Sequence, residues 1–260
     1  MARIVSIDIG TSRIKVALFD ETGNMNSLLS RRLDRAASPD TQDAVQWFDV
    51  TATLLRELNS ACPEAADAVV LTGNMHALLG VDRDGSPVAP AQLWSDNSAQ
   101  KESDQLNALF RDALLERFGN ASIPVFTLPK IMRMKKETPE RYAGTVKFLQ
   151  SKDYIAYRLT GNFVTDPSDA SGTLAMELDS KQWSVPLLDE LKLDAGKLPD
   201  ILPSAGLCGR VTAEAASRTG LAQGTPVITG AGDLASAAVG GGVNSSTLSL
   251  TLGTAGQLLG

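Results

Sequence analysis

Residues 4–12 read Ile-Val-Ser-Ile-Asp-Ile-Gly-Thr-Ser, a β-branched run that ends in a turn. The run at 3–9 predicts a strand, and a second apolar run at 14–19 predicts the strand that follows the turn. Asp-Glu-Thr-Gly-Asn at 20–24 is typical of a hairpin turn and leads to a third predicted strand at 25–33. We therefore expect the chain to open with an antiparallel meander whose first turn carries Gly-Thr-Ser.

The rest of the chain alternates between strand and helix patterns, which predicts the α/β class. Apolar residues recur at helical spacing between 46 and 60, and a buried strand is predicted at 68–72. The middle is helical and irregular, with helices predicted at 97–118, 128–137 and 151–159. A buried strand at 226–229, a tight Gly-Ala-Gly turn at 230–232 and a helix from 233 follow, and 248–252 predicts one more strand.

Composition excludes several classes of protein. The chain has 260 residues, of which 43% are hydrophobic and 21% charged, as in ordinary globular proteins. A net charge of −6 without a basic patch argues against a nucleic-acid partner. The one histidine, His76, excludes sites that need several, and Cys62 and Cys208 lie too far apart for a CxxC motif.

The cysteines and the apolar runs also bear on location. Two distant cysteines are typical of reduced thiols. No run reaches the roughly 18 to 20 apolar residues of a membrane span, and the first residues lack the apolar segment of a signal peptide. We expect a cytoplasmic protein without a membrane partner.

The turn after the first strand has the chemistry of a phosphate site. Gly10 lets the backbone approach a ligand, and the amides and hydroxyls of Thr11 and Ser12 suit phosphate oxygens. A similar strand and turn recur at 250–255, so two such turns could hold a triphosphate between them. Asp8 beside a phosphate turn predicts a bridging cation, and Mg²⁺ is the natural one. The alternative is that each turn is only a hairpin connection.

Asp233 is the second acidic candidate. It follows a strand and begins a helix, so its carboxylate is expected at the carboxyl edge of the sheet, where α/β proteins bind ligands. A carboxylate there can accept a proton from a substrate hydroxyl. It can also serve as a helix N-cap, and the two roles are compatible.

Two short segments suit a polyol. Met75 and His76 follow the strand at 68–72, and Trp94 with Asp96 ends another apolar run. An aromatic face beside a carboxylate matches the CH faces and hydroxyls of a sugar. His76 can equally be a structural histidine, and Trp94 can equally belong to the core.

Together these pieces resemble the FGGY carbohydrate kinase family. The motifs occur in the family's order from residue 4 to 256, and the ordered set is far more specific than any one motif. They are Asp8-Ile9-Gly10-Thr11-Ser12 with Lys15, Gly73-Asn74-Met75-His76, Leu93-Trp94-Ser95-Asp96, Lys152-Asp153-Tyr154, Tyr157-Arg158-Leu159-Thr160-Gly161, Thr165-Asp166, Ser168-Asp169-Ala170-Ser171-Gly172-Thr173, Gly230-Ala231-Gly232-Asp233 and Leu252-Gly253-Thr254.

The resemblance implies a ribonuclease-H-like, actin-like ATPase fold: a mixed five-stranded sheet flanked by helices, with helical insertions. It implies ATP and Mg²⁺ as cofactors, and a sugar bound in the cleft between two domains. The implied roles are the catalytic base and a metal ligand for Asp233, a metal ligand for Asp8, cofactor binding for Gly10, Thr11, Ser12, Lys15, Gly253 and Thr254, and sugar contacts for Met75, His76, Trp94, Asp96 and Asp233.

The implied activity is ATP-dependent phosphorylation of a sugar or polyol hydroxyl. The Met-His pair and the segment at 168–173 look most like those of xylulokinases, whereas the sequence around His76 and Trp94 also looks like that of gluconokinases. Leu234 stands where xylulokinases usually carry Asn, so the sugar stays open. Two alternatives are a sugar-sensing domain without catalysis, which has no use for both Asp8 and Asp233, and an actin- or chaperone-like ATPase, which does not need the sugar segments.

The same resemblance predicts two parts of the chain. Residues 1–243 correspond to the N-terminal sugar-binding and catalytic domain, and 244–260 to the first strands of a C-terminal nucleotide-binding domain. Because the family's adenine pocket lies in that second domain, we expect these residues alone to bind sugar weakly and to turn over little or not at all. A homodimer is left open.

Overall fold

The computed structural model describes residues 2–34, 38–244, 246–252 and 256–259. The strands are β1 (Arg3–Ile9), β2 (Arg13–Asp20), β3 (Met25–Arg32), β4 (Thr41–Gln42), β5 (Ala68–Gly73), β6 (Leu79–Val81), β7 (Ala91–Gln92), β8 (Lys147–Leu149), β9 (Val164–Thr165), β10 (Asp200–Ile201), β11 (Leu207–Arg210), β12 (Pro226–Gly232), β13 (Ser249–Leu252) and β14 (Gly256–Leu259). The helices are α1 (Ala44–Ala61), α2 (Gln100–Phe118), α3 (Thr127–Glu137), α4 (Pro139–Gly144), α5 (Ser151–Thr160), α6 (Pro167–Ser171), α7 (Val185–Glu190), the 3₁₀ helix η1 (Ala195–Lys197), α8 (Ala213–Thr219) and α9 (Asp233–Gly240).

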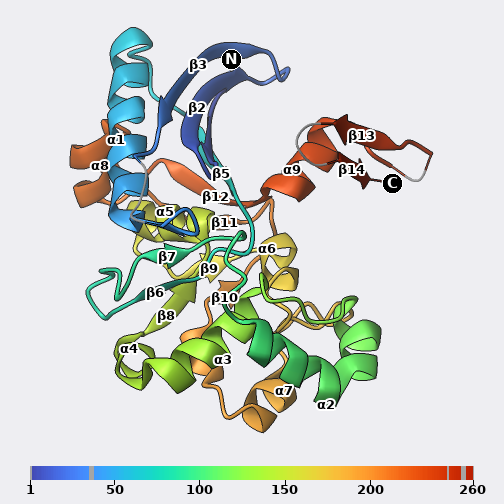
Figure 1. Cartoon of the computed structure of the whole chain (residues 1–260). Helices are drawn as coiled ribbons and strands as arrows, with labels where there is room; N and C mark the ends of the chain where they lie inside the picture. The colour runs from blue at the N-terminus through green and yellow to red at the C-terminus, as the bar shows by residue number, and fades with distance from the viewer. Residues whose placement is uncertain (1, 35–37, 245, 253–255, 260) are drawn as a thin grey trace.

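The largest sheet in the described residues has the strand order β11-β12-β5-β1-β2-β3. Strand β5 runs parallel to both β1 and β12, whereas β1 and β2, β2 and β3, and β11 and β12 pair antiparallel. The expected mixed sheet and opening meander are therefore confirmed (Figure 1). The sheet has six strands instead of the five expected, because Leu207–Arg210, a short stretch with little apolar pattern, pairs with β12 at one edge.

Helices α1, α5 and α8 pack with the sheet around the larger core (Figure 1). Helix α1 begins after Asp43, whose side chain accepts a hydrogen bond from the amide of Val45. Its Trp47 is fully buried and meets the ring of Tyr154, from α5, edge-on with ring centroids 6.4 Å apart. This core fixes the strands whose ends carry the candidate site.

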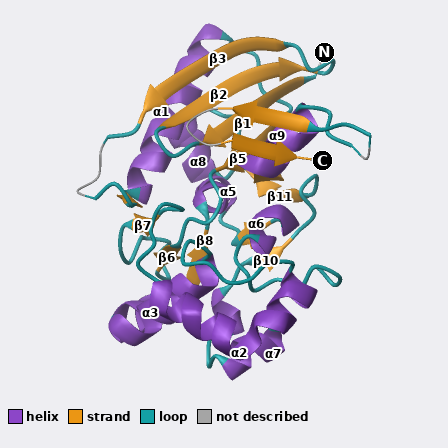
Figure 2. Ribbon diagram, turned by 45° about the vertical axis from the view of Figure 1, so that its right-hand side comes forward, coloured by secondary structure: helices purple, strands orange, loops and turns teal. Residues whose placement is uncertain are grey.

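A second core lies at the opposite end of the molecule from strands β1–β3. Figure 2 shows α2, α3 and α7 gathered there, and their buried side chains include Leu106, Leu128 and Leu188. These helices are the insertions expected in the middle of the chain. Short pairs such as β6 with β8 and β4 with β7 lie between the two cores.

The end of β12 differs from the expected turn at 230–232. These residues continue the strand to Gly232, and the register with β5 shifts between Ile228 and Ala231. Gly230 makes this bulge: its φ is +74°, and a Cβ would lie 1.6 Å from the carbonyl oxygen of Leu71. The glycines that indicated a turn serve instead to bring two strands into close contact before α9 begins.

Two expectations from the rest of the chain are met in the described residues. Strands β13 and β14 form an antiparallel hairpin, as the strand at 248–252 and its return predicted. Cys62 and Cys208 are free thiols, one half-buried and one buried. No helix in the described ranges has the length and apolar character to cross a membrane.

Candidate active site

The carboxyl ends of the parallel strands β1, β5 and β12 meet at one edge of the sheet. Asp8 on β1 lies opposite Thr72 on β5, and Thr72 lies opposite Ala231 on β12. Asp233 comes two residues after Ala231 and begins α9. Two residues 225 positions apart in the sequence are thus brought to the same edge, as the strand pattern predicted.

Helix α9 is tied to this edge by hydroxyl groups. Thr72 donates a hydrogen bond from Oγ1 to Ser236 Oγ at 3.0 Å, and Ser236 Oγ lies 3.2 Å from the carbonyl oxygen of Ala231. Directly after β5, the side-chain amide Nδ2 of Asn74 donates to the carbonyl of Ile9 at 2.9 Å. These contacts hold the start of α9 and the ends of β1 and β5 together.

Asp233 lies in an environment that favours its protonated form. Burial raises its pKa, the negative charge of Asp8 raises it further, and a 2.7 Å hydrogen bond from the amide of Leu234 opposes the shift. The N-cap position of α9 belongs to Gly232, so capping is not the role of this carboxylate. A carboxylate with a raised pKa at a sheet edge is suited to accept a proton.

Asp8 pairs with Lys15, its direct neighbour across β1 and β2. The ammonium Nζ lies 2.8 Å from Asp8 Oδ2, and both side chains are partly exposed. No group of three or more acidic, histidine or cysteine side chains in the described residues forms a metal cage. Two nearby carboxylates that repel each other suit Mg²⁺, which usually takes one or two carboxylates and completes its shell with water and phosphate oxygens.

The turn between β1 and β2 is held from several directions. The amide of Gly10 donates to the carbonyl of Arg13 at 3.2 Å, and a Cβ on Gly10 would lie 2.9 Å from that oxygen. The carbonyl of Thr11 accepts a hydrogen bond from the side-chain amide Nε2 of Gln42, and its Oγ1 accepts one from the indole of Trp94 at 3.0 Å. The turn is a hairpin connection, and it also carries the hydroxyls of Thr11 and Ser12.

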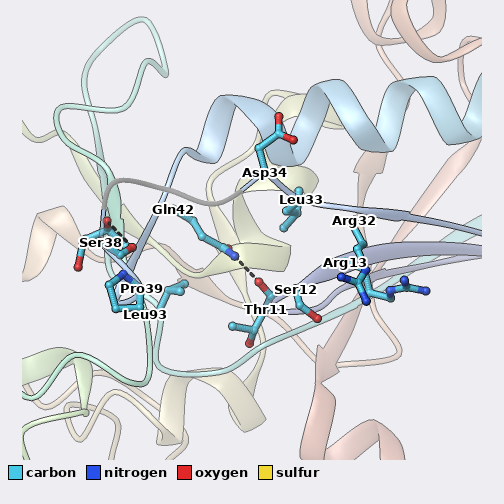
Figure 3. A pocket seen from close by; sticks show the side chains of 11 residues that line it. Thr11, Ser12, Arg13, Arg32, Leu33, Asp34, Ser38, Pro39, Gln42 and Leu93 are labelled. Carbon is cyan, nitrogen blue, oxygen red and sulfur yellow. Dashed lines mark hydrogen bonds between the residues drawn. The ribbon is translucent and has the colours of Figure 1, made fainter.

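A pocket of about 640 Å³ adjoins this turn (Figure 3). Gln42 reaches from beside α1 to Thr11, and Arg13 and Arg32 lie next to each other on paired strands. Among the predicted site residues only Thr11 and Ser12 line it, so it is separate from the edge that carries Asp233.

Met75 and His76 lie against the residue that precedes Asp233 and against α6. A Cβ on Gly232 would lie 2.7 Å from Met75 Cγ, and a Cβ on Gly172 would lie 2.9 Å from His76 Cε1. His76 has φ of +62°, its Nδ1 lies 2.8 Å from the carbonyl of Gly172, and its ring packs on Phe126. Because a carbonyl only accepts, Nδ1 carries the proton.

The other nitrogen of His76 is then free to accept a hydrogen bond. Burial lowers the pKa of His76, and the positive charge of Lys130 adds to that effect, whereas the bond to Gly172 opposes it. The neutral ring with its proton on Nδ1 has a lone pair on Nε2.

Lys130 joins the two segments that were predicted to contact a sugar. From α3 its buried ammonium donates to the carbonyl of His76 at 3.0 Å and to that of Leu93 at 2.6 Å. Burial lowers its pKa to about 8, against the attraction of Asp96 and Asp40. Asp96 is buried and accepts from the amide of Ser98, and the neighbouring Trp94 is 50% exposed.

The structure thus brings together Asp8, Lys15 and Asp233, joins Thr11 to Trp94, and links the His76 and Asp96 segments through Lys130. Gly253 and Thr254 lie outside the described residues. Sequence reasoning gave no role to Gln42, Lys130 or Ser168. Only Ser168 lay in a motif that had been singled out; Gln42 and Lys130 act through side-chain contacts to distant backbone, which no local pattern signals.

Comparison with known proteins gives a family. The model of the FGGY family of carbohydrate kinases, N-terminal domain, matches residues 3–240. The xylulose kinase of Staphylococcus xylosus is 31% identical over 265 residues, which covers all of this chain and 55% of that enzyme. The chain spans about half the length of the curated relatives it matches.

Solved structures agree with the relatives. A xyloylose kinase from Brucella ovis superposes with a TM-score of 0.92 at 31% identity, over 98% of this chain and 54% of that one. A gluconate kinase from Lactobacillus acidophilus superposes with the same TM-score at 26% identity, over 99% of this chain and 53% of that one. The expected fold is confirmed, and the chain belongs to the FGGY family of carbohydrate kinases, with residues 3–240 corresponding to its N-terminal domain.

Proposed function

We propose that this chain is the sugar-binding and catalytic part of an ATP-dependent carbohydrate kinase. One observation supports this most: Asp233 stands near Asp8 at the sheet edge, with its carboxylate accessible to a substrate, next to the segment of Met75 and His76. A sugar sensor has no need for the two carboxylates, and an actin-like ATPase has no need for the Met-His and Trp94 segments. The kinase is the function that uses all of them.

Asp233 acts as the general base. Its carboxylate takes the proton of a substrate hydroxyl while that oxygen forms a bond to the γ-phosphorus of ATP and the bond from this phosphorus to the β-phosphate oxygen breaks. The raised pKa of Asp233 brings its basicity closer to what proton transfer near neutral pH requires. Phosphoryl transfer of this kind depends mainly on positioning and on neutralising charge.

Residues around Asp8 hold the phosphates. The Gly10 turn offers backbone amides and the hydroxyls of Thr11 and Ser12, and Lys15 adds a positive charge beside Asp8. Asp8 and Asp233 would hold Mg²⁺, which supplies charge neutralisation to the transferred phosphoryl group when bound. Gly253 and Thr254 are proposed as the second phosphate turn.

The sugar lies between the Met-His segment and Trp94. His76 Nε2 accepts a hydrogen bond from a sugar hydroxyl, the exposed face of Trp94 packs on CH groups, and Asp96 is proposed as a further sugar contact. A xylulose-like ketose is the first candidate, because sequence relatives bear the name xylulose kinase. Gluconate is the second, since the gluconate kinase structure superposes equally well and Leu234 replaces the usual Asn.

The division into domains belongs to the same proposal. Residues 1–243 form the catalytic domain, and 244–260 are the first strands of a nucleotide-binding domain. The hairpin β13–β14, which α9 connects to the sheet edge in Figure 1, supports this division.

The base assignment is tested in a full-length enzyme that contains residues 1–260. Asp233→Ala should lower kcat by about 10² to 10⁴-fold, the usual contribution of a general base. A coupled assay of ATP consumption over pentuloses, hexuloses, polyols and gluconate measures this and also identifies the sugar. Asp189→Ala, an exposed carboxylate on α7, is the matched control and should keep full activity. Near-normal turnover of the Asp233 variant would contradict the assignment.

A further inference from the structure

A buried charge cluster lies directly behind the residue that precedes Asp233. The ammonium of Lys152 is 2.7 Å from Asp153 Oδ1, 3.0 Å from Asp166 Oδ1 and 3.1 Å from Asp169 Oδ2, and all four side chains are at most 2% exposed. One ammonium and three carboxyl groups share a space that solvent barely reaches. Burying such groups lowers the stability of the fold unless each one is paired or hydrogen-bonded, so the partners of each group in the cluster matter.

Two of the carboxylates have local tasks. Asp153 accepts from the amide of Gln150 in the capping box of α5, and Asp166 caps α6 by accepting from the amides of Ser168 and Asp169. Lys152 thus ties the start of α5 to the start of α6. The cluster fixes two helix ends relative to each other.

Asp166 is also connected by hydrogen bonds to the sheet edge that carries Asp233. Its Oδ2 accepts hydrogen bonds from the hydroxyls of Ser168 and Ser204, both at 2.7 Å. Ser168 Oγ in turn accepts from the amide of Gly232 at 2.9 Å. A continuous chain of polar contacts therefore runs from Lys152 through Asp166 and Ser168 to the residue before Asp233.

Asp169 closes the other side of Gly232. A Cβ at Gly232 would lie 2.9 Å from Asp169 Oδ1, and this oxygen has no hydrogen-bond partner in the described residues. The same Cβ would lie 2.7 Å from Met75 Cγ, so the side chains of Met75 and Asp169 leave no room for a side chain at Gly232. Gly232 is the N-cap of α9, so its placement sets where the Asp233 carboxylate stands.

We propose that Lys152, Asp166 and Ser168 form a positioning chain that fixes the amide of Gly232 and thereby orients Asp233 toward the substrate hydroxyl. The inference rests on the proposed function of Asp233. A catalytic group must be held within about 0.5 Å of its productive geometry, and it is held there by the hydrogen bonds of its neighbours. Ser168 is the link that can be removed without leaving a buried charge unpaired.

The test compares three variants. Ser168→Ala removes the acceptor of the Gly232 amide, Ser168→Thr keeps a hydroxyl there, and Ser171→Ala is the matched control. Ser171 lies on the same short helix, and its hydroxyl donates to the carbonyl of Ser168 instead of reaching the site. Thermal unfolding of each variant verifies that it folds.

Two readouts are used. Amide hydrogen exchange of Gly232 in the 260-residue chain should be about tenfold or more faster in Ser168→Ala, and near normal in the other two. In the full-length enzyme, kcat of Ser168→Ala should fall about tenfold while KM for the sugar stays within twofold, and Ser168→Thr should restore most of kcat.

The outcomes separate this proposal from the proposed function. Faster exchange at Gly232 with unchanged kcat would overturn the positioning role of Ser168, and so would unchanged exchange. A fall in kcat equal in Ser171→Ala would overturn it as well, since that result reports a general weakening of α6. If the unaltered enzyme phosphorylates no sugar, the function of Asp233 is wrong, whereas the exchange result still decides whether Ser168 holds Gly232.

Discussion

Lys130 and Lys152 are both 1% exposed, yet their surroundings differ in kind. Lys152 faces three carboxylates, and their attraction raises its pKa despite the opposing effect of burial. Lys130 donates to two backbone carbonyls, with Asp96 and Asp40 acting only as nearby charges, and burial lowers its pKa to about 8. Carboxylate partners offset the cost of burying an ammonium, and carbonyl dipoles offset only part of it.

The two lysines also join different parts of the molecule. Lys152 lies behind the sheet edge that carries Asp233, where it fixes α5 and α6 against each other. Lys130 comes from the helical insertion and holds the backbone of the two segments that are proposed to bind a sugar, at His76 and Leu93. Lys152 is surrounded by carboxyl groups that offset the cost of its burial, whereas Lys130 is buried at a cost in stability where it joins two segments that are proposed to bind a sugar.

The largest effect is expected from Lys152→Met. The buried carboxylates of Asp153 and Asp166 then lose their cation, which should lower the free energy of unfolding by about 3 to 5 kcal/mol, as for other broken buried ion pairs. Urea denaturation at pH 7 measures it. Lys101→Met, at an exposed lysine of α2, is the control and should change stability by less than about 0.5 kcal/mol. A loss for Lys152→Met as small as for the control would mean that the carboxylates do not need the ammonium.

Lys130 should instead change how the free energy of unfolding depends on pH. Its pKa is about 8 in the folded protein and about 10.4 in the unfolded chain, so between these values the unfolded state binds more protons. The free energy of unfolding should therefore rise with pH across this window, by about 3 kcal/mol from Lys130 alone. Lys130→Met should remove that rise relative to the unaltered chain.

Urea denaturation at pH 7.5, 9 and 10 measures the slope. Lys101→Met should keep the rise, because it removes an exposed ammonium on α2 and leaves Lys130 in place. Lys152→Met should keep it too, since the raised pKa of Lys152 places its titration above the window. An identical slope with and without Lys130 would show that its ammonium is not the group that titrates.

The hydrophobic pattern was enough to predict the elements that carry the site. The strands at 3–9, 68–72 and 226–229 and the helix from 233 lie where their periodicity indicated, and their parallel pairing places Asp8 and Asp233 at one edge. Strand β11 and the bulge at 230–232 were missed, because a short edge strand has little pattern and glycines read as a turn.

The contacts that organise the site were beyond local patterns. Lys130 meets a carbonyl 54 residues away, and Ser168 meets an amide 64 residues away. A backbone group is a partner of the same kind in any sequence, so nothing in the residues at either end indicates such a bond. The buried lysines could be recognised only once their burial and partners were known.

The smallest expected effect distinguishes between two of the carboxyl groups that surround Lys152, those of Asp166 and Asp169. Burial raises the pKa of Asp169 to about 8, whereas Lys152 and the serine hydroxyls hold the pKa of Asp166 below its usual range. At pH 6 Asp169 is therefore protonated and Asp166 ionised. Asp169→Asn, which resembles the protonated acid, should cost less than about 1 kcal/mol at pH 6, and Asp166→Asn should cost several times more.

The same pair of variants has a pH signature. Because the folded protein holds the Asp169 proton up to about pH 8 while the unfolded chain releases it near pH 4, this residue lowers stability as pH rises between those values. Asp169→Asn should flatten that decline in denaturation series at pH 5, 6.5 and 8, and Asp166→Asn should not. If the two variants behave alike, the ammonium of Lys152 is shared evenly among its carboxylates, and the chain from Lys152 to Ser168 loses the distinct partner on which it depends.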